Sequence, residues 1–342
     1  MEFTETSNTE TTYAYSVGRI RELENTLLNK VLLDKMIEAP DLVSSLNILR
    51  ERGFESYGSE AYRLEDWENS LDQELLQTYK IIKDLSPYPF LYEVFALNYD
   101  FHNLKVLIKA KYRGKKYNTT TALVEIGTVK VKNLIMAIEE EKFVEIPVPF
   151  EVAVKKLMSE YNKFPDPEII DLLLDKEKYI IILSLLKDKR APFLEKFIRV
   201  DIDLNNILIA IRIKIRGEDK NFLRKALIEG GNLNLKNLTE ILDSPLSSWN
   251  TRFAKTDYEK MVELGLKSYE EFHSLLEIER LMDNFRLDYV KIGKFITLGM
   301  EPLIGFIIAK EIDLKNIRLI LRSKLDKLSP TKIKERIREA YV

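Results

Sequence analysis

The sequence predicts an all-α protein, and three observations support this fold class. Apolar residues recur at steps of three and four along most of the chain, which is the spacing of one helix face. Strand-like alternation is brief, as at 210–215, where a helical interpretation competes with it. The 342 residues include only 12 glycines and 11 prolines, so few points interrupt the helices. Long helices with polar outer faces and short connections predict packed helical hairpins.

The N-terminal part of the chain shows where helices should begin and end. One apolar stripe over 17–31 predicts a helix that stops before Pro40, because proline disfavours helix at the residue before it. Asp41 is then expected to cap a helix over 42–52, with Gly53 beyond its C-terminal end.

Later helices follow from the same spacing. A stripe over 67–82 predicts a helix that ends near Pro87. Further helices are expected over 128–140, 151–162, 168–187, 233–242, 257–264 and 268–285.

Composition and charge exclude several classes of protein. The chain is 45% hydrophobic and 32% charged, which provides material for a sizeable core and is too apolar for a disordered protein. The formal net charge of −2 and the pI of about 6.0 leave no basic field to hold nucleic acid. Cysteine is absent from the sequence, which rules out disulfides and thiolate metal sites.

The N-terminus and the apolar runs predict a soluble protein. Residues 1–12 are polar and lack the basic and apolar regions of a signal peptide, so we expect a disordered extension there. The most apolar runs, over 179–186, 207–211 and 303–309, are far shorter than the about 20 residues that cross a bilayer. We therefore expect no transmembrane segment, and any membrane role would be peripheral.

A long-range repeat is the most informative feature of the sequence. Three prolines at 89, 192 and 302 are each followed by an aspartate 11 residues later (100 − 89, 203 − 192 and 313 − 302). An asparagine follows each aspartate after three residues, which gives the set Asp100, Asn103, Asp203, Asn206, Asp313 and Asn316. A weaker match lies upstream, where Asp72 and Asp175 precede their prolines by 17 residues and Asp283 precedes its own by 19. Three copies with an ungapped core predict a triplicated helical unit.

Each copy is interpreted as a helix, a tight corner and a second helix. The prolines suit the first turn of the first helix, where no amide donor is missed. The aspartates and asparagines are expected to cap the second helix by accepting hydrogen bonds from its free N–H groups. Direct contact with a partner is the alternative role. Units of more than 100 residues can close around a pseudo-threefold axis or form an open groove.

Cations occupy the last turns of the second helix in every copy. The set comprises Lys109, Lys111, Arg113, Arg212, Lys214, Arg216, Arg322 and Lys324. Acidic residues first and cations last complement the helix dipole. The same cations are candidates for a partner interface, either with acidic protein surfaces or with anionic headgroups.

No catalytic arrangement can be assembled from the sequence. The two histidines, His102 and His273, are expected to be structural or solvated. Gly114 and the two lysines after it lack the remaining residues of a phosphate-binding loop. Asp201 and Asp203 have too few acidic neighbours for a metal site. We therefore expect no catalytic residue, no cofactor and no metal.

Several segments resemble a known family. The C-terminal segments 301–311, 316–321 and 333–341 resemble the C-terminus of the C-subunit family of V-type and A-type ATPases (ATP synthases), whose eukaryotic relatives are called d subunits. Tyr13-Ala-Tyr15 and Arg19-Ile-Arg21 are similar to the opening helix of that family, and 98–105 is similar to its first helix corner. The resemblance spans essentially the whole chain, although the polar residues before Tyr13 depart from the family.

The resemblance implies three similar helical domains around a pseudo-threefold axis, arranged as a funnel over 13–117, 118–219 and 220–342. In the family the funnel seats on the proteolipid rotor ring, and its cavity receives the central shaft that the D and F subunits form. The chain would then be a non-catalytic coupling subunit that transmits torque for proton or sodium transport. It would be a monomer within a hetero-oligomeric complex, cytoplasmic and peripheral to the cell membrane.

Two other functions are considered. One is a helical scaffold that binds RNA or acidic protein partners through its basic helix ends, which the balanced net charge disfavours. The other is an enzyme with an unrecognised site, which the missing site chemistry disfavours. The coupling ion and the direction of the reaction, ATP synthesis or hydrolysis, stay open at this point.

Overall fold

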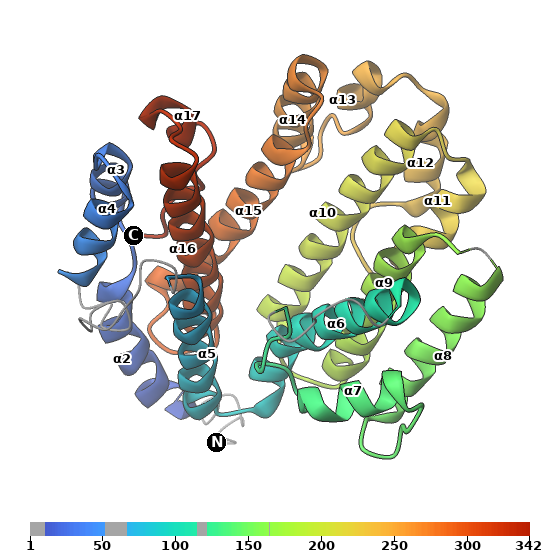
Figure 1. Ribbon diagram of the computed structural model, residues 1–342, viewed down its shortest axis with the longest axis horizontal. Helices are drawn as coiled ribbons and strands as arrows, with labels where there is room; N and C mark the ends of the chain where they lie inside the picture. The colour runs from blue at the N-terminus through green and yellow to red at the C-terminus, as the bar shows by residue number, and fades with distance from the viewer. Residues whose placement is uncertain (1–10, 52–66, 115–121, 164) are drawn as a thin grey trace, which may run out of the picture. The chain divides into compact units, whose positions relative to one another are not determined.

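The structure is a computed structural model that describes residues 11–51, 67–114, 122–163 and 165–342. Within these ranges the regular elements are α-helices and short 3-10 helices, without a strand, which confirms the predicted all-α class (Figure 1). No helix in these ranges combines the length and the apolar composition that a membrane crossing needs. Most of the predicted extension, residues 1–10, lies outside the described residues, as does Gly53, and Thr11 and Thr12 are helical.

The chain divides into two compact units. The first contains residues 1–87 and 244–342, so both ends of the chain contribute to it. The second contains residues 88–243. The three domains expected over 13–117, 118–219 and 220–342, and their arrangement as a funnel, stay predictions.

The first unit is built on one long helix, α16 (Glu301–Leu325). In the described residues, the helices that pack directly on it come from both the N-terminal and the C-terminal part (Figure 1): α2 (Ala14–Leu23), α3 (Lys30–Glu38), α4 (Leu42–Arg50), α5 (Trp67–Leu85), α15 (Leu276–Val290), the 3-10 helix η5 (Lys291–Phe295) and α17 (Pro330–Lys334). The helix α14 (Glu259–Phe272) packs on α15, and α13 (Trp249–Arg252) packs on α14. The core joins Leu28, Met36 and Trp67 to Ile317 and Ile320 of α16.

The second unit contains two long helices, α6 (Pro89–Arg113) and α10 (Pro192–Arg216). On α6 lie α7 (Val131–Glu139) and α9 (Pro167–Leu186), and α8 (Val148–Lys163) packs on α9. On α10 lie α11 (Lys220–Ala226) and α12 (Leu235–Glu240). Phe95 and Phe197 bring the two long helices into contact, with ring centroids 6.2 Å apart.

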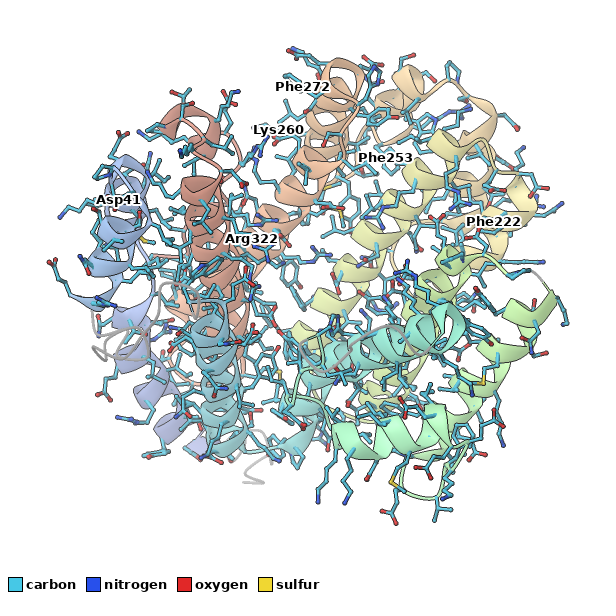
Figure 2. All side chains as sticks on the ribbon, viewed as in Figure 1. Asp41, Phe222, Phe253, Lys260, Phe272 and Arg322 are labelled. Carbon is cyan, nitrogen blue, oxygen red and sulfur yellow. The ribbon has the colours of Figure 1, made fainter. Side chains whose placement is uncertain are left out.

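Local sequence sets many helix ends. Asp41 accepts a hydrogen bond from the Ser44 N–H at 2.8 Å and caps α4, as the sequence predicts (Figure 2). The repeated prolines stand in the first turns of α6, α10 and α16, also as predicted. Gly217 ends α10 with φ of 72°, a left-handed conformation that glycine adopts without strain.

The helix predicted over 17–31 differs from the structure. The stripe over 17–31 is divided, because a 3-10 turn (Glu24–Thr26) and an extended Leu27 separate α2 from α3. Asn29 starts α3 by accepting from the Leu32 N–H at 2.9 Å. Periodicity misses this break because Leu27 and Leu28 are both buried and continue the apolar pattern.

The helices expected over 257–264 and 268–285 are both displaced. The helix α14 continues to Phe272 and α15 begins only at Leu276. His273 ends α14 in a left-handed conformation with φ of 49°, a position where glycine or asparagine is the usual signal.

Candidate functional site

The repeated polar residues form three equivalent groups, which we call clasps. Each consists of an aspartate, the asparagine three residues later and a lysine eleven residues after the aspartate. At about 100° per residue, these three side chains share one stripe of a helix. Clasp 1 on α6 is Asp100, Asn103 and Lys111; clasp 2 on α10 is Asp203, Asn206 and Lys214; clasp 3 on α16 is Asp313, Asn316 and Lys324.

The prediction of a helix corner at each aspartate was wrong. The helices α6, α10 and α16 each run without interruption for 25 residues, and the aspartates lie near their middle. The amides of a helix interior are already bonded within the helix. The carboxylates therefore cap a different segment of the chain, and their partners lie far away in sequence.

The carboxylates of clasps 1 and 2 each receive three hydrogen bonds from a loop. Asp100 accepts from the N–H and hydroxyl of Thr128, both at 2.7 Å, and from the Val129 N–H at 3.1 Å. Asp203 accepts from the N–H of Asn232 at 2.9 Å, from its side-chain amide at 3.0 Å and from the Leu233 N–H at 2.9 Å. Both carboxylates are fully buried, and these bonds replace the water that they lose.

Clasp 3 lacks two of these bonds. Asp313 accepts from the Leu28 N–H at 2.8 Å through Oδ2, while Oδ1 is buried without a hydrogen-bond partner in the described part of the chain. Leu27 stands where Thr128 and Asn232 stand in the other copies, and it carries no side-chain donor. The carboxylate of clasp 3 is consequently the least satisfied of the three.

The side-chain amide of each asparagine binds both the backbone N–H and the backbone carbonyl of one residue in another segment. In clasp 2 the Asn206 amide donates to the Ile228 carbonyl and its oxygen accepts from the Ile228 N–H, both at 2.8 Å. Asn103 does the same with Val124 at 2.8 and 2.9 Å, and Asn316 with Arg338 at 3.1 and 2.9 Å. A side-chain amide thus imitates the pairing of a β-ladder in an all-helical protein.

Each lysine donates to a carbonyl at the end of a short helix. Lys111 reaches the Ile138 carbonyl of α7 at 2.8 Å, and Lys214 reaches the Leu242 carbonyl after α12 at 2.8 Å. Lys324 donates to the carbonyls of Ile37 and Ala39 at the end of α3. A cation is favoured there because the last carbonyls of a helix have no partner within it and carry negative partial charge.

Burial changes the acidity of two clasp carboxyls. Burial, opposed by the hydrogen bonds from Thr128 and Val129, raises the pKa of Asp100 to about 6. For Asp313 burial is opposed only by the Leu28 N–H and by the charge of Lys310, and it raises the pKa to about 7. Burial is the largest cause of both shifts, and the hydrogen bonds to each carboxylate oppose it.

The weaker upstream match in the sequence corresponds to ion pairs. Asp72 of α5 pairs with Arg318 of α16 at 2.9 Å, and Asp175 of α9 pairs with Lys105 of α6 at 2.7 Å. In the third copy Asp283 lies among Lys315, Arg286 and Arg338. Burial alone would raise the pKa of Asp283, but the three cations lower it to about 2.

The cations predicted for a partner interface have partners within the chain. Lys109 donates to both carboxylate oxygens of Asp171, at 2.6 and 2.7 Å. Arg216 contacts Asp166, Glu168 and Glu218. Arg322 pairs with Glu68 at 2.8 Å, and its side chain stays 59% exposed (Figure 2). Arg113 and Arg212 also take part in intramolecular interactions. Contact of these cations with another protein stays a prediction.

Two glycines in the bound loops were missed by the sequence reasoning. A Cβ at Gly127 would lie 2.0 Å from Asp100 Oδ1, and one at Gly231 would lie 2.2 Å from Asp203 Oδ1. Only a residue without a side chain lets the loop approach the carboxylate this closely. The signal in the sequence is slight, since Gly127 and Gly231 are each followed by one polar and one apolar residue.

The chemistry of the clasps is structural. Their buried carboxylates and amides bind backbone groups, and in the described ranges no group of three or more acidic or histidine side chains is arranged to hold a metal ion. His102 contacts the Ala122 carbonyl at 2.9 Å, which adds to clasp 1. The clasps tie short helices and loops to the three long helices.

The fold and the clasps define an all-helical scaffold with a repeated device for binding its own backbone. Residues 16–336 match the family model of the ATP synthase (C/AC39) subunit, and the chain belongs to this family. This confirms the resemblance carried by the terminal segments.

Relatives cover the chain almost completely. The C subunit of the V-type sodium ATPase of Enterococcus hirae is 26% identical over 94% of this chain and 96% of its own length. The C subunit of the A-type ATP synthase of Methanocaldococcus jannaschii is 28% identical over 94% and 85%, and that of Pyrococcus furiosus is 25% identical over 96% and 91%.

Proposed function

We propose that this chain is a non-catalytic central-stalk subunit of a V/A-type rotary ATPase, which joins the shaft formed by the D and F subunits to the membrane proteolipid ring. The observation that carries the proposal is the family match over residues 16–336. Near full-length similarity to C subunits of both V-type and A-type machines supports it. The chain would lie on the cytoplasmic side of the membrane, attached through the complex.

The clasps support a role in transmitting torque. A coupling part has to resist deformation, and buried side chains that bind backbone groups hold each segment in one register. A buried ion pair adds to the attachment of α5 to α16, because Lys310 of α16 pairs with Glu74 of α5 at 2.6 Å and only 4% of the Lys310 side chain is exposed. Breaking such a buried pair costs more than breaking a surface pair.

The use of polar groups also supports a non-catalytic role. The most deeply buried acids and amides on the long helices are bound to backbone groups or to cations, and these contacts stabilise the fold. The relative from Enterococcus hirae is named for sodium and the archaeal relatives are named for ATP synthesis. The proposal therefore covers either coupling ion, proton or sodium, and either direction of the reaction, ATP synthesis or hydrolysis.

A reconstitution assay tests the proposal. Membrane vesicles that hold the ring and stator would be combined with the nucleotide-binding head and shaft, with and without this chain. We expect ATP hydrolysis by the head in both cases, but ATP-driven ion uptake only when the chain is added. Ion uptake of equal rate without the chain would overturn the coupling role. Retention of RNA by the chain at physiological salt would instead favour the helical-scaffold alternative.

A further inference from the structure

The N-terminal helix α3 occupies on α16 the place that α7 occupies on α6. The residue bound by the clasp aspartate and the residue bound by the clasp lysine are nine positions apart in every copy (138 − 129, 242 − 233 and 37 − 28). The helices α7, α12 and α3 all begin two residues after the aspartate-bound residue. One unit of structure therefore recurs three times, although its third instance comes from the other end of the chain.

The helix α5 extends the same equivalence. It packs on α16 as α9 packs on α6. The ion pair is equivalent as well, because Arg318 and Lys105 each lie five residues after their clasp aspartate and pair with Asp72 and Asp175. The segment α3–α5 thus corresponds to α7–α9, which follow α6 directly in sequence.

The two chain ends meet inside clasp 3. In clasps 1 and 2 the residue held by the asparagine precedes the residue held by the aspartate by five positions (129 − 124 and 233 − 228). In clasp 3 these two places are taken by Arg338 near the C-terminus and by Leu28. They bind positions of α16 only three residues apart, which is about 4.5 Å along the helix axis.

We propose that segments from both ends of the chain complete the third copy, and that clasp 3, where these segments meet, is the junction at which the fold opens first. The segment α3–α5 is then a strap that completes the third copy and can leave α16 while clasps 1 and 2 stay closed. The strap would behave in this way whether or not the chain works in a rotary ATPase.

Chain connectivity and hydrogen bonding both favour opening at clasp 3. Asp313 and Leu28 are 285 residues apart, whereas Asp100 and Val129 are 29 apart. A longer connection between two partner segments lowers their effective concentration for each other. The carboxylate of clasp 3 also receives one hydrogen bond where the others receive three.

A circular permutant tests the proposal in the full chain. Val342 would be joined to Thr11 through a flexible linker of about 15 residues, which reaches about 20 Å. New ends would be placed between Glu125 and Ile126, inside clasp 1. Amide hydrogen exchange of α3 and α7 would then be compared by mass spectrometry in the natural chain and in the permutant.

The proposal makes opposite predictions for the two chains. In the natural chain the amides of α3 should exchange about tenfold or more faster than those of α7. In the permutant α7 should become the faster segment. Equal exchange of α3 and α7 in the natural chain, an unchanged order in the permutant, or a permutant that does not fold would each overturn the proposal.

A pair of substitutions tests the strap without moving the chain ends. Leu27→Asn supplies the side-chain amide that Asn232 supplies in clasp 2, and Leu27→Ala removes the same apolar bulk without adding a donor. We expect α3 to exchange severalfold more slowly in Leu27→Asn than in Leu27→Ala, with α7 unchanged. Equal exchange of α3 in the two variants would show that the missing donor does not control opening, against the proposal.

Discussion

Clasps 1 and 2 differ from clasp 3 in how fully the same three side chains are satisfied. In the second unit each carboxylate binds a glycine-containing loop that follows its own helix within 30 residues. In the first unit Asp313 binds Leu28, which is distant in sequence, and its Oδ1 has no hydrogen-bond partner in the described part of the chain. Repeating a side chain across copies thus does not repeat its environment, because the environment depends on the segment that meets it.

The contrast also appears in the residues that the asparagines hold. Ile228, bound by Asn206, is buried, whereas Arg338, bound by Asn316, is half-buried near the chain end. Water can replace a lost hydrogen bond at Arg338 more readily than at Ile228.

The largest effect should come from removing an asparagine. In Asn206→Leu the N–H and the carbonyl of Ile228 both lose their partner in the core, and we expect a loss of about 3–5 kcal/mol in the free energy of unfolding. Asn316→Leu should cost about 1–2 kcal/mol, because the backbone of Arg338 can bind water. Urea unfolding followed by circular dichroism measures both.

An exposed asparagine provides the control for this pair. Asn47→Leu on the exposed face of α4 should change stability by less than about 0.5 kcal/mol. If Asn206→Leu and Asn316→Leu lost the same stability, the contrast between the buried and the half-buried partner would be refuted.

A smaller effect is expected at the glycines, which exist only in the better-satisfied clasps. In Gly231→Ala the new Cβ would lie 2.2 Å from Asp203 Oδ1, so the loop has to withdraw from the carboxylate. We expect a loss of about 2–4 kcal/mol, and a similar loss for Gly127→Ala. Gly18→Ala in α2 meets no atom within 4 Å and should instead add about 0.5–1 kcal/mol. A neutral Gly231→Ala variant would show that the loop does not depend on this close approach.

Local features of this fold could be predicted from the sequence, because their causes are local. The cap at Asp41 and the proline starts of the long helices depend on residues within one turn. The triplication was visible as a fixed spacing from proline to aspartate. The role of Asp100 was misjudged, because its partners Thr128 and Val129 lie 28 and 29 residues away and leave no mark beside it.

Clasp 3 could not be predicted for a further reason. The segment that it binds, which begins at Leu28, carries no copy of the proline, aspartate and asparagine core. Its equivalence to the loops at Val129 and Leu233 depends on three-dimensional contacts alone. Continuous apolar spacing through Asp100 could have argued against a corner, since Leu97, Phe101 and Leu104 continue one helical stripe.

The smallest expected effect is a pH dependence that separates clasp 3 from clasp 1. Because burial raises the pKa of Asp313 to about 7, the folded chain keeps a proton on this carboxyl at pH values where the unfolded chain has lost it. Its contribution to stability is full below about pH 4 and is lost as the pH rises through 7. Asp313→Asn keeps an acceptor for the Leu28 N–H and never ionises. The variant should therefore gain roughly 1–3 kcal/mol over the natural chain between pH 5 and pH 8.

Asp100→Asn is the matched comparison, and it should gain less stability than Asp313→Asn at pH 8. Burial raises the pKa of Asp100 to about 6, so at pH 8 its carboxylate is charged and accepts three hydrogen bonds. The oxygen of an asparagine there can accept the two bonds from Thr128, but its amide N–H would face the Val129 N–H. This repulsion should offset much of the gain from removing the ionisable group. Urea unfolding at pH 5 and pH 8 measures both variants. An equal change in stability for Asp313→Asn and Asp100→Asn at pH 8 would mean that the two carboxyls are equally well satisfied, and the distinction between the clasps would fail.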